Sequence, residues 1–441
     1  MPLDRDEALA LAQELAEIRD NESTRLNLIR QYLRDDPDDR RLGGIPNGAP
    51  QDVVRLAKLS RVNLLKFVVN SRVQAMFVDG IQTPDSPDNL AVWEAWQRNR
   101  MDARQVGLHR AALAYGAAYA TVMPGDPVPV IRGASPRALT AAYAGDDDWP
   151  QAALQQLGNG RWRLIDNEAV YTLTKSNQSD RFELVDTAEH GMTWDGQPVT
   201  PVVRYRDTDD LDDPVRGVVE PLMPLQDQVN ITTFGLQVAQ HYGAFRQRYI
   251  IGWLAESEQQ ALKTGASKLM MFEDDPSQIK VGEFAQTELR GYIDSREATI
   301  RHLATVSQTP VHEILGEMIN MAAEALEAAR ASHHAAVDEN RIMAGESHEQ
   351  TLGLAGEAMG APPDPSATVV WRDTRVRSLT EAAGAFRDLV EGLGVPPRAL
   401  WPRIPGVAQH ELARWESLAD EGDAFDDLAR LLDRQASGAD A

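Results

Sequence analysis

The chain has 441 residues, of which 67 are acidic and 44 basic, so its formal net charge is −23. This acidity argues against a protein that holds nucleic acid or an anionic membrane surface through a basic footprint. Cysteine is absent, which excludes disulfides, thiolate catalysis and cysteine-ligated zinc or iron–sulfur sites. At about 150 residues per domain, this length allows roughly three domains.

The N-terminus lacks the basic start and apolar core of a secretory signal peptide. The sequence has no run of the roughly 18 apolar residues that a membrane-spanning helix needs. We therefore expect a protein that is made in the cytoplasm and does not enter a membrane.

The first part of the chain has the apolar spacing of helices. This spacing covers 4–34, 52–76, 89–99 and 102–118, with a loop rich in proline and glycine at 35–52. One short strand is expected at 78–83. The buried positions expected in the later helices are Trp93, Trp96, Leu108 and Leu113.

A change of pattern between 119 and 206 predicts a small antiparallel β region. Short β-type runs alternate there with turns of glycine, aspartate, asparagine and proline. The runs cover 119–124, 127–133, 162–166, 169–174, 181–187 and 200–207. The acidic stretch that follows, 207–214, is expected to be a solvated loop.

The second half of the chain is again mainly helical. Its expected elements are a long helix at 216–246, β-type runs with a short helix (256–263) within 247–283, a helix at 284–306, a break at 307–316, an alanine-rich helix at 318–360, a lone strand at 368–373 and short helices over 378–435. The alanine-rich helix would span roughly 60 Å. The fold class predicted is α+β, mainly helical.

The stretch 246–280 is electrically neutral inside this acidic chain. Its five basic residues are Arg246, Arg248, Lys263, Lys268 and Lys280, and five acidic residues balance them. One interpretation is a mixed surface loop. The other is a surface that faces an anion such as DNA, to which local positive charge binds by releasing counterions.

No catalytic motif is complete. His312-Glu313 begins a zinc-protease motif, but the second histidine would fall at 316, which is glycine. His333 and His334 lack the Glu-x-x-His spacing of a helical carboxylate–metal site. P-loop, dinucleotide-binding and nucleophile-elbow motifs are also missing. We expect no catalytic residue, metal or cofactor, and a structural role becomes more plausible.

The segment RGVVEPLMPLQDQVNITTFGLQVAQHYGAFRQRYIIGW (216–253) resembles portal proteins of long-tailed, siphovirus-type bacteriophages. Three further segments fit the same family in the same order: 306–329, VVWRD (369–373) and IPGVAQHELARWESL (404–418). So do NESTRLNLIRQYLRDD (21–36) and NLLKFVVNSRVQAMFVDG (63–80). The order of the segments, more than any one of them, is specific, and it covers nearly the whole chain.

The resemblance implies a ring, usually of twelve subunits, at one capsid vertex, with a tunnel through which double-stranded DNA enters and leaves. It implies a subunit with wing, stem, clip and crown regions. The corresponding segments are 1–215 (N-terminal wing), 216–245 (first stem helix), 246–284 (clip), 285–305 (second stem helix), 306–320 (tunnel loop), 321–375 (long wing helix and strand) and 376–441 (helical crown or tail).

The resemblance also implies functional residues and partners. His312, Glu313 and Asn320 become candidates for the tunnel loop, and the five basic residues of 246–280 become candidates for contact with DNA phosphates or with the packaging motor. DNA contact would be weak and independent of sequence. The implied partners are the terminase large subunit, a head–tail adaptor, and the major capsid and scaffold proteins. No fused head-morphogenesis domain is expected after the crown.

Two other classes remain open from the sequence. One is a different phage structural or scaffold protein, which would form no closed ring. The other is a cytoplasmic enzyme without a recognisable motif, which would be a monomer or a small oligomer. Measuring the native mass distinguishes both classes from a portal, which would form a closed ring of many subunits.

Overall fold

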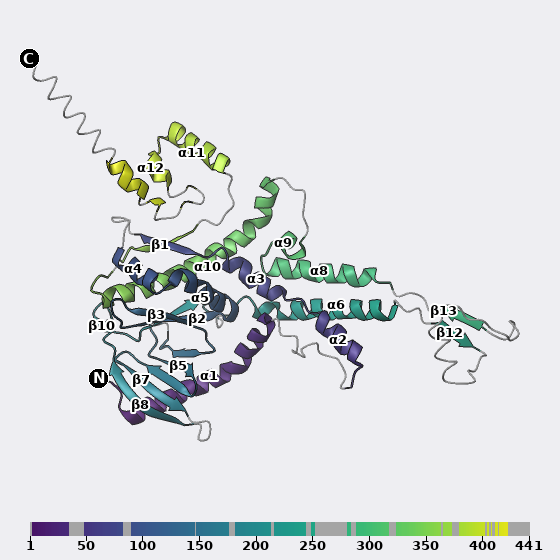
Figure 1. Ribbon diagram of the computed structural model, residues 1–441, viewed down its shortest axis with the longest axis horizontal. Coiled ribbons are helices and arrows are strands. Elements are labelled where there is room, and N and C mark those ends of the chain that lie inside the picture. Colours follow the sequence, from purple (N-terminus) through teal and green to yellow (C-terminus); the bar gives the residue numbers. More distant parts are fainter. Residues whose placement is uncertain are drawn as a thin grey trace, which may run out of the picture. The chain divides into compact units, whose positions relative to one another are not determined.

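A computed structural model describes residues 2–34, 48–82, 90–145, 147–175, 181–212, 216–243, 248–251, 280–283, 288–316, 323–362, 365–372, 379–401, 404, 407, 411–412 and 414–421. The chain forms two compact units. Unit 1 comprises 1–30, 67–220 and 324–441, and unit 2 comprises 31–66 and 221–323. The elements of both units are labelled in Figure 1. The predicted α+β class is confirmed, whereas the division into seven segments stays a prediction.

The helices predicted before residue 118 are present. They are α1 (Arg5–Leu33), α2 (Gln51–Leu59), α3 (Leu64–Val73), α4 (Leu90–Arg98) and α5 (Met101–Tyr115). The region 52–76 holds two helices because α2 ends at Ser60, whose backbone N–H donates to the carbonyl of Leu56. Trp96 is fully buried, and Trp93 stacks on it with ring centroids 5.4 Å apart. Most of the loop expected at 35–52 lies outside the described residues.

The β region forms two main antiparallel sheets. The three-stranded sheet has the order β11-β2-β3 and the five-stranded sheet the order β4-β5-β6-β7-β8. Their strands are β2 (Ala117–Met123), β3 (Val130–Ala134), β4 (Leu139–Ala142), β5 (Ala152–Gly158), β6 (Arg161–Ile165), β7 (Ala169–Lys175), β8 (Phe182–Glu189) and β11 (Val202–Arg206). A two-stranded hairpin, β9 (Thr193–Trp194) with β10 (Gln197–Pro198), adds to them. The sequence did not predict β4 and β5, because alanine and glutamine dominate them and strands are poor in alanine.

The strand predicted to be alone has a partner far away in the sequence. β14 (Thr368–Trp371) pairs antiparallel with β1 (Val78–Gln82), so that Val78 lies opposite Trp371 and Gln82 opposite Thr368. Val78 and Ile81 are buried in the same apolar core as Val369. The expectation of a lone strand is therefore wrong, because period-2 alternation shows a strand but not its partner.

The second half of the chain is mainly helical, as predicted. Its described helices are η1 (Glu220–Leu222), α6 (Met223–Gly243), α8 (Arg290–Val306), α9 (Val311–Leu315), α10 (Ala323–Ala358), α11 (Leu379–Leu393) and α12 (Pro397–Leu400), and two strands, β12 (Arg248–Ile251) and β13 (Lys280–Glu283), separate α6 from α8. The short helix α9 was not predicted, since it lies within the expected break at 307–316. The short helix predicted at 256–263 lies outside the described residues. None of the described helices is long and apolar enough to span a membrane.

The first of these helices begins later than residue 216, its predicted start. The chain at Gly217 runs tightly along α5, where a Cβ would come within 2.5 Å of the carbonyl oxygen of Leu113. The backbone N–H of Val218 donates to the same oxygen at 2.9 Å. This extended contact prevents a helix before Glu220.

A buried polar cluster joins α10 to the end of β11. Asn340 Nδ2 donates to Oδ1 of Asp207 at 2.9 Å and to its backbone carbonyl at 3.0 Å. Arg72 Nη1, on α3, donates to Oδ1 of Asn340 at 3.2 Å. Asp207 is only 2% exposed. The solvated loop expected at 207–214 therefore starts one residue later, because Asp207 is a buried hydrogen-bond acceptor.

This cluster makes the stability of unit 1 depend on pH. Burial raises the pKa of Asp207 from 3.8 to about 7, although the nearby Arg72 opposes the shift. The unfolded chain loses this proton near pH 4 and the folded chain near pH 7. Between these values the folded state binds more protons, so raising the pH lowers its stability.

We expect Asp207→Asn to remove this pH dependence, because the amide keeps an oxygen for Asn340 and cannot ionise. From pH 5 to pH 8 the Tm of the wild type should fall relative to that of the variant, by about 2–4 °C for each kcal/mol of proton-linked stability. Thermal unfolding followed by circular dichroism measures this. Asp212→Asn, at an exposed position, is the control. A constant difference in Tm between wild type and D207N over this pH range would contradict the prediction.

Candidate functional site

Two helices of unit 2, α6 and α8, flank the candidate segment 246–284 in the sequence. The tunnel-loop candidates follow directly after α8. The two helices lie side by side (Figure 1). Gly235 in the later part of α6 faces Tyr292 near the start of α8, so the two helices run antiparallel. A Cβ at Gly235 would lie 3.0 Å from Tyr292 Cε1. This glycine therefore allows a tyrosine ring to pack directly on the α6 backbone.

Charge is scarce along α6, whereas α8 carries three arginines and two carboxylates. Among the 21 residues of α6, Asp227 is the only acidic residue and His241 the only basic one, and the carboxylate of Asp227 accepts a 2.6 Å hydrogen bond from Tyr32. The rest of its polar side chains are amides and hydroxyls. This scarcity of charge is visible in the amino-acid sequence of α6.

Two of the three arginines of α8, Arg290 and Arg301, are paired with carboxylates of the same helix; the third is Arg296. Arg290 Nε lies 3.4 Å from Asp294, and Arg301 Nη2 lies 3.3 Å from Glu297, both at i,i+4 spacing. Such exposed pairs contribute little stability, about 0.3–0.5 kcal/mol each. They do, however, leave the helix pair close to neutral.

Two of the five basic candidates in 246–280 occupy described strands. β12 and β13 pair antiparallel, with Arg248 opposite Glu283 and Lys280 opposite Ile251. Arg248 thus has an acidic residue across the ladder, whereas Lys280 does not. Arg246, Lys263 and Lys268 lie outside the described residues, so the grouping of all five into one surface stays a prediction.

The predicted break after α8 is a defined corner. Ser307 follows α8, Gln308 has a positive φ of 52°, and the N–H of Thr309 donates to Ala304 O at 2.9 Å. Pro310 then precedes α9, and Gly316 ends it with a φ of 68°. The corner therefore turns the chain through residues whose backbone conformations end one helix and begin the next.

Of the three tunnel-loop candidates, two lie on the short helix α9. His312 Nε2 is 3.9 Å from Glu313 Oε1, and their side chains are 14% and 28% exposed. His312 is thus largely shielded from solvent within the single chain. Asn320 lies outside the described residues. A role for these residues in a narrow bore stays a prediction.

A buried histidine–tyrosine group is the described arrangement that most resembles acid–base machinery. His109 Nε2 lies 2.7 Å from His348 Nε2, and His348 Nδ1 lies 3.0 Å from the hydroxyl of Tyr205. Burial lowers the pKa of His109 to about 4 and that of His348 well below its ordinary value. Both imidazoles are neutral at pH 7 and at most 1% exposed, so they serve to pack α5, β11 and α10 together.

The described residues hold no group of three or more histidines, aspartates or glutamates placed to bind a metal ion. His333 and His334, weighed above as a metal pair, have ring centroids 6.4 Å apart. Among the described residues, the histidines thus form no metal site with neighbouring carboxylates.

Comparison with known proteins gives one extensive match. The model of the family described as "Phage portal protein, SPP1 Gp6-like" matches residues 12–423. No curated protein matches.

Three similar solved structures come from gene transfer agent particles. The virion of the native particle contains a chain with 16% identity and a TM-score of 0.49, over 80% of this chain and 91% of that chain. The neck of the native particle, computed with C12 symmetry, gives 15% and 0.48, over 80% and 92%. The neck of the empty particle, computed with C6 symmetry, gives 14% and 0.41, over 80% and 92%.

We expect Gly235→Leu to destabilise unit 2, because the new side chain would enter the space of the Tyr292 ring. Overpacking of this kind costs about 1–3 kcal/mol, which a lower midpoint in urea unfolding would record. Gly291→Leu, on α8 with no atom within 4 Å of its Cβ position, is the matched control. Adding Tyr292→Ala to the first variant should restore part of the loss. Equal midpoints for the two leucine variants would contradict the close packing of α6 on α8.

Proposed function

The chain belongs to the SPP1 Gp6-like family of phage portal proteins, and from this membership we propose that it is one subunit of a ring-shaped DNA conduit in a virion. Double-stranded DNA would enter through the ring during packaging and leave through it during ejection. The family match over residues 12–423 is the observation that carries this proposal. The role is structural, as it is for the family.

The scarcity of charge on α6 and the small net charge of the α6–α8 pair support placing these helices beside the DNA. Duplex DNA carries one negative charge per about 1.7 Å, and each unpaired cation on a wall would strengthen binding by releasing counterions. A conduit must let its cargo slide. The amide and hydroxyl side chains of α6 would hold DNA weakly. So would Arg290 and Arg301 of α8, which are already paired with carboxylates, and this leaves Arg296 as the third arginine of the pair. The negative charge of the whole chain would repel it further.

We place the remaining candidates around this pair. The segment 246–284, with Arg246, Arg248, Lys263, Lys268 and Lys280, would make the local phosphate contacts and dock the packaging motor. His312, Glu313 and Asn320 would lie near the bore after α8. Since the sequence has no P-loop, the energy of packaging would come from a separate ATPase, the terminase large subunit. A head–tail adaptor would replace it later, and the wing would meet capsid and scaffold proteins.

We propose assembly into a ring of twelve subunits, the usual number in the family. Unit 2 leaves several large apolar side chains exposed: Leu59 on α2 by 60%, Ile231 on α6 by 54% and Val306 on α8 by 60%. The helix α2 lies against α6, since Gln237 donates to the carbonyl of Leu59 at 3.3 Å. Apolar surface on neighbouring helices favours contact with another protein surface. A second copy of the same unit would cover it.

Ile293, on α8 of the same unit, is also exposed, by 39%. The double variant Ile231→Asp/Ile293→Asp should therefore lower the fraction of protein in rings, because it puts charge on the proposed subunit contact. Native mass spectrometry and negative-stain images measure the fraction and show the central hole. Val185→Asp, at a 61% exposed position on β8 of unit 1, should leave ring formation unchanged. A wild type that stays a monomer or dimer even with capsid and scaffold proteins present would contradict the conduit and favour an enzyme.

Charge reversal at Lys263 and Lys268 should impair motor docking or retention of DNA while leaving ring assembly intact. The reason is that these lysines would meet phosphates or the motor and not neighbouring subunits. Packaging assays with purified heads measure the DNA retained, and native mass checks the ring. Normal packaging and retention by rings of the reversed variant would remove these lysines from the contact surface.

A further inference from the structure

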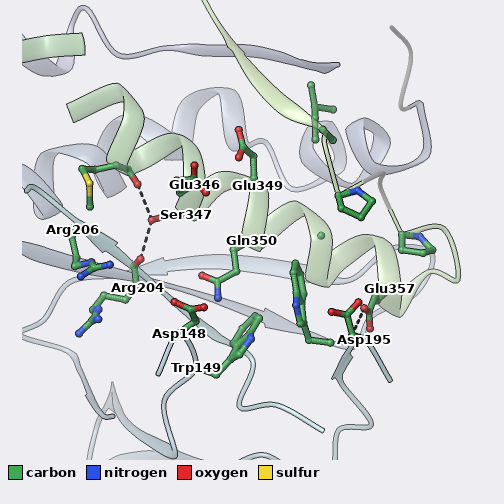
Figure 2. Close-up of a pocket in the computed structure, with 17 residues that line it drawn as sticks. Asp148, Trp149, Asp195, Arg204, Arg206, Glu346, Ser347, Glu349, Gln350 and Glu357 are labelled. Atoms are coloured by element: carbon green, nitrogen blue, oxygen red, sulfur yellow. Dashed lines mark hydrogen bonds between the residues drawn. The ribbon is translucent and has the colours of Figure 1, made fainter. Parts of the chain in front are cut away.

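A groove runs along α10 in unit 1 and is not used by the proposed conduit. It has a volume of about 440 Å³. Met343, Gln350 and Gly353 of α10 lie in it, Trp149 and Trp194 line it from the β region, and Pro362 and Pro365 follow from the chain after α10. Figure 2 shows Gln350 reaching from the helix toward Asp148 and Trp149. The groove thus combines an apolar lining with polar groups.

Two tryptophans form the aromatic part of this groove. The ring centroids of Trp149 and Trp194 are 5.5 Å apart, with their planes tilted by 54°. Trp194 lies directly on the α10 backbone, since a Cβ at Gly353 would come within 2.6 Å of its ring. Glu357 holds the β9–β10 hairpin against α10, because its carboxylate accepts from the N–H of Asp195 at 2.6 Å. The pair is thereby held in place on one helix.

Each indole has an acidic neighbour in the groove. Asp148 precedes Trp149, and Asp195 follows Trp194; both are exposed. Among the described residues, neither carboxylate has a hydrogen-bonding or ion-pair partner within the groove. The two arginines of the groove are engaged elsewhere. Arg206 Nη1 binds Asp209 at 2.6 Å, and the guanidinium of Arg204 lies 4.1 Å from the centroid of the Tyr143 ring.

We propose that this groove binds an arginine or lysine side chain presented by another virion protein. Indole faces attract organic cations, and the adjacent carboxylates of Asp148 and Asp195 supply the opposite charge. The aliphatic stem of such a side chain would lie along the indole rings. The amide of Gln350 offers a donor and an acceptor to the backbone of the docking segment, which favours a peptide over a free polyamine.

The test uses the full-length protein and the peptide acetyl-Ala-Arg-Ala-Arg-Ala-amide in isothermal titration calorimetry. At about 0.15 M salt, charges more than about 8 Å apart are largely screened, so local contacts dominate. The peptide in which citrulline replaces both arginines keeps the shape and removes the charge. We expect at least tenfold weaker binding of the citrulline peptide.

The variant Asp148→Asn/Asp195→Asn should weaken binding of the arginine peptide at least threefold. Both positions are exposed, and Asp195 has a φ of 50°, a conformation that asparagine accepts, so the variant should fold. The control is Glu183→Gln/Asp186→Asn on β8, which removes the same charge from another exposed part of unit 1. Equal weakening by both variants, equal binding of the citrulline peptide, or binding of spermidine as tight as that of the peptide would overturn the proposal.

Discussion

The hydrogen bonds that α10 buries at Asn340 and His348 determine where this helix lies in unit 1. Asn340 holds Asp207 at the end of β11, and His348 meets both Tyr205 of β11 and His109 of α5. Apolar packing of alanine and leucine alone would define the position of such a helix less uniquely. The polar partners fix it, because a shift of one turn would leave several buried groups without hydrogen bonds, each costing about 1–3 kcal/mol.

Much of the architecture follows from local sequence patterns. The helices and the β-type runs were predicted because apolar spacing reports which face of an element is buried. Apolar spacing does not show which other element packs against that face. Alanine-rich β4 and β5 carry no strand signal of their own, and only their neighbours in the sheet make them strands. Asp207 belongs to an acidic stretch whose composition predicts a solvated loop. Its burial against α10 cannot be predicted from the adjacent residues.

The candidate site was predicted less completely than the fold. The five basic residues of 246–280 were predicted as contact residues because the rest of the chain is acidic. Only Arg248 and Lys280 fall within described strands, and Arg248 lies opposite Glu283. The preceding helix α6 has few charged residues, a pattern visible in its sequence. The family resemblance supplied the functional interpretation, since neither the motifs nor the pairwise geometry of the described residues specify what passes along α6 and α8. Packing at Gly235 could not be predicted, because it depends on Tyr292, 57 positions later in the sequence.

The pairing of β1 with β14 has a consequence for synthesis on the ribosome. Residue 82 is made well before residue 368, and at about 5–20 residues per second the interval is roughly 15–60 s. During this time the nascent β1 has an open edge, and the apolar core that it shares with Val369 is incomplete. All residues of unit 2 have been made by 323, before β14 emerges. Unit 2 interrupts unit 1 in the sequence. The order of translation thus allows the helices of unit 2 to fold before β14 pairs with β1 and completes unit 1.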